Sequence, residues 1–259
     1  QGVVNGYALV FASVMLAAGA IGDEFGHRKV MLAGAGVFCA GSIMCAVAPS
    51  SAVLIGGRAV MGLGAAGSEP GTLSMLRHLY PDRRRRARAT GVWAAVSGLA
   101  LALGPVIGGV LVGLGGWRWI FWFNLVLGVA ALVVGAMLLP ETSNPHAHRV
   151  DTVGALLGAS MLALFVFAVI NGETAGFASA EVLTLFATSA VACAAFVWWQ
   201  LRARHPLLEL GYLHNRTAMT SNVVAFAAYF GTFAIFFFTA LYLRVVVGFS
   251  GYRIATQFL

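Results

Sequence analysis

The chain has 259 residues, of which 60% are hydrophobic and only 10% are charged, and its net charge is +7. A water-soluble domain is roughly 45–50% apolar and about one quarter charged, so this composition excludes an ordinary soluble protein. Repeated apolar runs of about 20 residues have the length that crosses a bilayer core of roughly 30 Å. We therefore expect an all-α fold, a polytopic transmembrane helical bundle.

Eight transmembrane spans are predicted from these apolar runs. In chain order their approximate bounds are 3–21, 30–48, 52–76, 89–113, 119–139, 153–170, 180–200 and 218–243. The sequence starts with Gln-Gly-Val-Val, without a charged segment before the first span, so we do not expect a cleavable signal peptide. We expect the sequence to be a fragment, because 249–259 resembles a loop leading into another span.

The basic residues are distributed unevenly between the connecting segments. If the first span ends in the cytoplasm, cytoplasmic segments carry 12 of the 16 Lys and Arg residues and opposite segments carry three. This asymmetry is the positive-inside pattern, and it predicts the orientation of a multi-pass membrane protein. Fifteen Arg against one Lys is typical of a GC-rich bacterial genome, so we expect the plasma membrane of a bacterium. The arginine-rich run 82–88 (DRRRRAR) is interpreted as an orientation signal that contacts lipid headgroups, not nucleic acid.

The three cysteines, Cys39, Cys45 and Cys193, lie within apolar runs. They lack the spacing of a metal site or a disulfide framework, and free cysteine behaves as a small hydrophobic residue. We expect neither a metal nor another cofactor.

The first connection, GAIGDEFGHRKVML (19–32), concentrates charge between two apolar runs. A tight turn between two spans needs small residues where backbones approach closely and ionic groups that hold neighbouring helix ends. The sequence supplies both, and we expect a gating loop formed by Gly19, Asp23, Gly26, Arg28 and Lys29.

The third span carries two ionisable residues, Arg58 and Glu69. An ionisable group at mid-membrane costs roughly 2.5–3.5 kcal/mol on insertion scales, so it is seldom present without a partner or a task. With Gly62 these residues lie at i, i+4 and i+11, within about 20° of one helix face, and the two charges are ~16 Å apart along the axis. We predict that Arg58, Gly62 and Glu69 line a proton and substrate cavity. Two structural alternatives stay open: an ion pair of Arg58 with a missing helix, and pairing of Glu69 with Arg77 or another loop arginine.

The fourth span contains GLALALGPVIGGV, with Gly98, Gly104, Pro105, Gly108 and Gly109. Proline removes a backbone donor and bends a helix, and glycines four residues apart allow close helix approach. We predict a kinked, tightly packed helix at a moving interface, or alternatively a helix with a purely structural role.

Three motifs together resemble the major facilitator superfamily. The turn matches G-x-x-x-D-x-x-G-x-R-K, RAVMGLGAAGSEP (58–70) resembles the fourth-helix motif, and the glycine-proline segment resembles the fifth-helix antiporter motif. The flanking segments resemble the fourteen-helix drug:proton antiporter branch, and the resemblance covers the whole chain as helices two to nine. Departures occur at Glu24 and His27, where this branch usually carries arginine, and at Met61, where glutamine is common.

The resemblance implies a domain division and a function. Residues 1–140 would form part of an N-terminal six-helix bundle, 141–152 a cytoplasmic linker, 153–200 two central helices, and 201–259 the start of a C-terminal bundle. The expected function is export of drugs or small organic molecules in exchange for protons, so the expected partners are a small-molecule substrate, protons and the lipid bilayer. An uncoupled facilitator or importer of the same fold is the alternative. A membrane-embedded enzyme is disfavoured because the sequence lacks a cluster of His, Asp, Ser or Cys at one depth.

Overall fold

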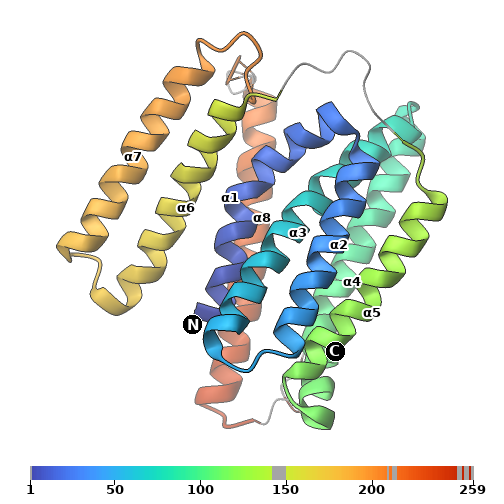
Figure 1. Cartoon of the computed structure of the whole chain (residues 1–259), viewed down its shortest axis with the longest axis vertical. Coiled ribbons are helices and arrows are strands. Elements are labelled where there is room, and N and C mark those ends of the chain that lie inside the picture. Colours follow the sequence, from blue (N-terminus) through green and yellow to red (C-terminus); the bar gives the residue numbers. More distant parts are fainter. Residues whose placement is uncertain are drawn as a thin grey trace. The chain divides into compact units, whose positions relative to one another are not determined.

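The computed structural model describes residues 2–141, 150–208, 210–211, 215–249, 253 and 257, and within these residues it contains helices but no strand (Figure 1). The expected all-helical fold is confirmed. Eight helices follow one another: α1 (Gly2–Phe25), α2 (His27–Ala46), α3 (Ser51–Leu79), α4 (Arg83–Gly115), α5 (Arg118–Leu138), α6 (Thr152–Ala175), α7 (Ala180–Gln200) and α8 (Arg216–Val245). Each coincides with one predicted span. Most of the predicted linker, 142–149, lies outside the described residues.

Seven of these helices are long and apolar enough to cross a membrane. The exception by this measure is α3, which has 29 residues and contains several glycines together with Arg58 and Glu69. The protein is therefore a multi-pass membrane protein. The predicted span at 52–76 forms a helix as expected, although α3 is not among the seven that are apolar enough by this measure.

Helix boundaries follow local chemistry. Gly26 separates α1 from α2 with φ of +100°, a conformation that favours glycine because it has no Cβ. Ser50, Asp151 and Asn215 lie just before α3, α6 and α8, and their side-chain oxygens accept hydrogen bonds from the first backbone N–H groups of each helix. Such N-caps satisfy donors that the helix itself leaves unpaired.

The chain divides into two units, which are described separately. The first contains residues 1–89 and 121–208, and so comprises α1, α2, α3, most of α5, α6, α7 and the first turns of α4. The second contains residues 90–120 and 209–259, and so comprises most of α4 and all of α8. The predicted division at 140, 152 and 200 stays a prediction.

Within the first unit, α2 and α3 pack closely along a line of glycines. A Cβ at Gly41 would lie 2.6 Å from the Met61 backbone nitrogen, and one at Gly34 would lie 2.6 Å from the Gly64 carbonyl oxygen. Only a missing side chain permits such backbone approach, as is common between membrane helices. Met61 and Cys45 are completely or almost completely buried at this contact, where Phe121 of α5 joins them.

The helices α6 and α7 form an antiparallel hairpin, which Figure 1 shows in yellow and orange. At one end, Asp151 accepts hydrogen bonds from Trp199 Nε1 at 2.8 Å and Gln200 Nε2 at 2.9 Å, in addition to capping α6. Further along the hairpin, Ser189 Oγ donates to the Met161 carbonyl at 3.0 Å. These bonds fix the register of the two helices.

Candidate functional site

The α1–α2 turn has the close packing that its glycines predict. Gly22 lies against the His27 ring, since a Cβ there would be 2.5 Å from Nδ1. Gly19 faces α3, where a Cβ would be 3.8 Å from Pro70. Gly26 lies beside the Glu141 carboxylate, which follows α5. The turn is therefore enclosed by α3 and by the segment after α5.

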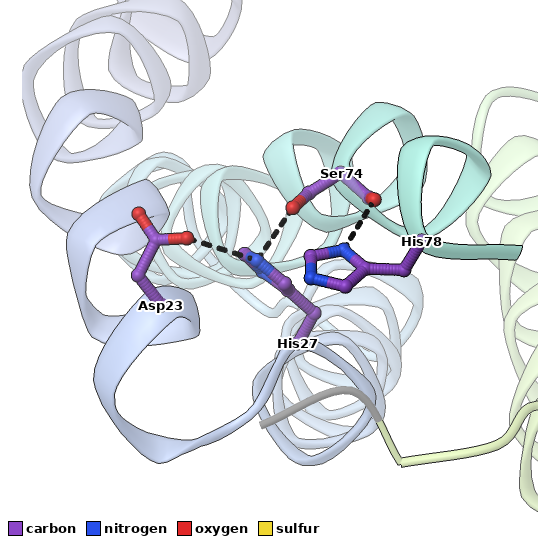
Figure 2. A network of polar contacts seen from close by, with 4 residues as sticks. All are labelled: Asp23, His27, Ser74 and His78. Carbon is purple, nitrogen blue, oxygen red and sulfur yellow. Dashed lines mark hydrogen bonds and ion pairs between the residues drawn. The ribbon is translucent and has the colours of Figure 1, made fainter. Parts of the chain in front are cut away.

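Asp23 and His27 connect this turn to α3. Figure 2 shows His27 Nε2 between two oxygens, Asp23 Oδ1 at 3.1 Å and Ser74 Oγ at 2.6 Å. His78 Nδ1 contacts the Ser74 carbonyl oxygen at 3.0 Å, and its ring centroid is 6.2 Å from that of His27. The ends of α1, α2 and α3 thus meet in one polar network.

Arg28 connects the turn to α5. Its Nη2 donates a hydrogen bond to the Ala136 carbonyl at 2.7 Å, 108 positions along the chain. Its Nε is buried and has no hydrogen-bond partner among the described residues. Lys29 is exposed. Of the two predicted basic members of the loop, Arg28 contacts the end of α5, and the gating role of both residues stays a prediction.

Glu24 connects the same turn to the start of α6. Its Oε2 accepts a hydrogen bond from the Val150 backbone N–H at 2.7 Å. Because Glu141 lies against Gly26, Glu141 and Val150 both lie beside the α1–α2 turn. Glu24 stands where the efflux branch usually has arginine, and in this chain it accepts a backbone hydrogen bond.

Arg58 and Gly62 face α1. The Arg58 guanidinium carbon is 4.5 Å from the centroid of the Tyr7 ring, within the range of a cation–π contact. Gly62 packs against the backbone of Tyr7, since a Cβ at Gly62 would be 2.6 Å from the Tyr7 carbonyl oxygen. Two of the three predicted cavity residues therefore contact α1.

Glu69 borders a cavity of about 460 Å³ between α2, α3 and α5. Apolar side chains form most of its wall, including Met31, Phe38 and Leu127, and Asn124 adds an amide from α5. Neither Arg58 nor Gly62 is among the lining residues. This cavity therefore contains one of the three predicted residues, and a cavity lined by all three stays a prediction.

The α4 motif has no close neighbour among the described residues at three of its glycines. Nothing lies within 4 Å of the position of a Cβ at Gly98, Gly104 or Gly108. The helix continues through Pro105, and none of its described side chains is buried. The tight packing predicted for this motif, including Gly109, stays a prediction.

Sequence reasoning missed several contributors to these sites, among them Ser74, His78, the Ala136 carbonyl and Asn124. Ser74 and His78 are four residues apart near the end of α3, so one helix face carries both. That spacing was a usable signal. The Ala136 carbonyl and Asn124 had no comparable signal, because their roles depend on where α5 packs.

The described residues form helices and no strand, and with a charged glycine turn and ionisable residues in α3 the chain belongs to the class of multi-pass membrane proteins. The Major Facilitator Superfamily matches residues 2–259, and the chain belongs to that family. The expected family is confirmed, as is the expected multi-pass location in the plasma membrane.

Named relatives align along nearly the whole chain. A methylenomycin A resistance protein of Bacillus subtilis is 37% identical over 99% of this chain and 55% of its own length. The multidrug resistance protein Stp of Mycobacterium tuberculosis is 33% identical over 96% of this chain and 47% of its own length. The multidrug efflux pump LfrA of Mycolicibacterium smegmatis is 33% identical over 96% of this chain and 49% of its own length. The chain thus spans about half the length of the curated relatives that it matches.

Proposed function

We propose that this chain is part of a proton-driven exporter of drugs or other small organic molecules. The observation that carries the export proposal is the similarity over 96–99% of the chain to proteins named for resistance or efflux. The antiporter-type segment from Gly98 to Gly109 favours coupled exchange over an uncoupled facilitator or importer.

The cavity beside Glu69 supports coupling. A carboxyl group bordered by Met31, Phe38 and Leu127 offers one ionisable site on an otherwise largely apolar surface. Such a carboxyl can hold a proton or attract a substrate cation, and the proton removes the charge that attracts the cation. Competition of this kind links proton uptake to substrate release.

The gating-loop residues Gly19, Asp23, Gly26, Arg28 and Lys29 would control the end of the bundle that we predict to be cytoplasmic. Their proposed role is supported by contacts from this turn to three other segments, through Ser74, Ala136 and Val150. Movement of any of these segments would change the contacts of the turn. Arg58 and Gly62 would position α1 against α3 through Tyr7.

The test is Glu69→Gln in the full-length protein, reconstituted in vesicles. The variant should lose substrate accumulation driven by an imposed pH gradient, because glutamine cannot exchange a proton, while substrate binding or equilibration persists. Ser68→Ala is a matched control on the same wall of the cavity, because it removes a hydroxyl without changing charge. Gradient-driven accumulation by Glu69→Gln at the wild-type rate would move the coupling site elsewhere.

A further inference from the structure

His27 is the buried centre of the α1–α3 contact. Its side chain is 4% exposed, whereas the Asp23 side chain is 72% exposed. The ring is therefore held in place by the helices around it. Asp23, at the edge of the contact, has room to turn toward the ring or away from it.

A single ring nitrogen faces two oxygens in this contact. His27 Nε2 lies 2.6 Å from Ser74 Oγ and 3.1 Å from Asp23 Oδ1 (Figure 2). When Nε2 lacks a proton, the Ser74 hydroxyl can donate to it, and the Asp23 carboxylate then faces a lone pair. When the ring is doubly protonated, Nε2–H donates and the positive charge attracts Asp23. The proton on Nε2 of the charged ring therefore decides whether His27 attracts the Asp23 carboxylate.

Other charged and titratable groups near the turn have contacts of their own. From α3, His78 approaches with its ring centroid at 6.2 Å and contacts the Ser74 carbonyl. Glu24 accepts from Val150, Glu141 lies against Gly26, and Arg28 donates to Ala136. Lys29 is exposed on the first turn of α2. Asp23 is the acidic side chain paired with His27.

We propose that His27 makes the contact between α1 and α3 proton-dependent. A proton on Nε2 of the charged ring joins Asp23, His27 and Ser74 into one network that ties three helix ends together, and loss of that Nε2 proton leaves His27 with Ser74 and releases Asp23. An arginine at position 27 would keep its charge at any physiological pH. Histidine instead changes charge in the range of cellular pH. The inference concerns the contact itself and holds whether or not the whole protein exports drugs.

The test is a double-mutant cycle in the purified full-length protein, read as the thermal unfolding midpoint at pH 5.5 and pH 8.0. Asp23→Asn should lower the midpoint by about 1–2 °C more at pH 5.5 than at pH 8.0, because only the protonated ring attracts the carboxylate. In a His27→Gln background, Asp23→Asn should have the same effect at both pH values.

Two further variants keep the test decisive. His78→Gln is the matched control, because it removes a neighbouring imidazole that does not contact Asp23, and the pH-dependent effect should persist. His27→Arg carries a permanent charge, so Asp23→Asn should have a large effect at both pH values, and this variant decides the matter if His27→Gln does not fold. An equal effect of Asp23→Asn at both pH values in the wild-type background would overturn the proposal, as would a pH difference that survives in His27→Gln.

Discussion

Glycines along α2 differ in the atoms that surround them. This difference determines how much a substitution by alanine changes the stability of the protein. At Gly41 a Cβ would lie 2.6 Å from the Met61 nitrogen and 2.9 Å from the Gly57 carbonyl oxygen, both backbone atoms of α3. At Gly36 nothing lies within 4 Å. Backbone atoms of a packed helix cannot move aside as a flexible side chain can, so the first position is intolerant and the second is open.

We predict that Gly41→Ala destabilises the protein by about 1–3 kcal/mol, the usual range for overpacking. Gly36→Ala, on the same helix, should be neutral or slightly stabilising, because alanine has the higher helix propensity. The thermal unfolding midpoints of the two full-length variants in detergent measure the difference. Equal midpoints would show that α2 and α3 do not approach as closely as described.

Single residues also show the limits of reasoning from sequence. The signature of the first turn pointed to Asp23 and Arg28, because charges between two apolar runs are unusual. The sequence did not pair His27 with Ser74, because these residues are 47 positions apart and the contact depends on the rotation of α3 against α2. Likewise, the spacing of Arg58 and Glu69 predicts one shared helix face. It does not predict their neighbours, because Tyr7 beside Arg58 belongs to α1 and much of the cavity wall beside Glu69 belongs to α2 and α5.

At the scale of elements, the helices themselves were predictable because each apolar run has the length of a membrane crossing. The spans predicted at 180–200 and 119–139 differ from α7 and α5 by no more than one residue. Interactions between helices were harder to predict from the sequence. The α6–α7 hairpin depends on Asp151, which sequence reasoning treated only as the edge of a linker, and its three hydrogen-bond donors come from α6 and from the end of α7.

We predict that Asp151→Ala loosens the hairpin at this end and lowers stability by about 2–3 kcal/mol. The substitution removes an N-cap and leaves the Trp199 and Gln200 donors without their acceptor. Glu181→Ala is the control at the opposite end of α7, where an exposed carboxylate accepts from Asn171 at 2.7 Å. Hydrogen exchange in α6 and α7 of the full-length protein should rise more in Asp151→Ala. The same exchange in both variants would remove Asp151 from the hairpin's stabilisation.

At the scale of the whole molecule, orientation in the membrane follows from the uneven distribution of Lys and Arg. Contacts within the first unit agree with one feature of the predicted topology, because the α1–α2 turn, the end of α3, the end of α5 and the start of α6 meet at one end. The α6–α7 turn lies at the other end of its hairpin. These two ends should face opposite sides of the membrane.

We predict that a membrane-impermeant thiol reagent added to intact cells labels Ala178→Cys, in the exposed α6–α7 turn, but not Arg85→Cys. Both variants are made in full-length protein whose native cysteines, including Cys39, Cys45 and Cys193, are replaced. Permeabilised cells provide the control, since both positions should then react. Labelling of Arg85→Cys in intact cells would reverse the orientation.

We propose that the complete protein couples proton movement to export. Full-length wild-type protein in vesicles, with the fluorescent cation ethidium as probe and the membrane potential clamped, tests it directly. An imposed pH gradient should drive ethidium across the membrane beyond its equilibrium distribution, and a protonophore should abolish this accumulation. Proton-coupled export would be contradicted if ethidium transport stopped at equal concentrations with or without the gradient. It would also be contradicted if no protein-dependent transport occurred.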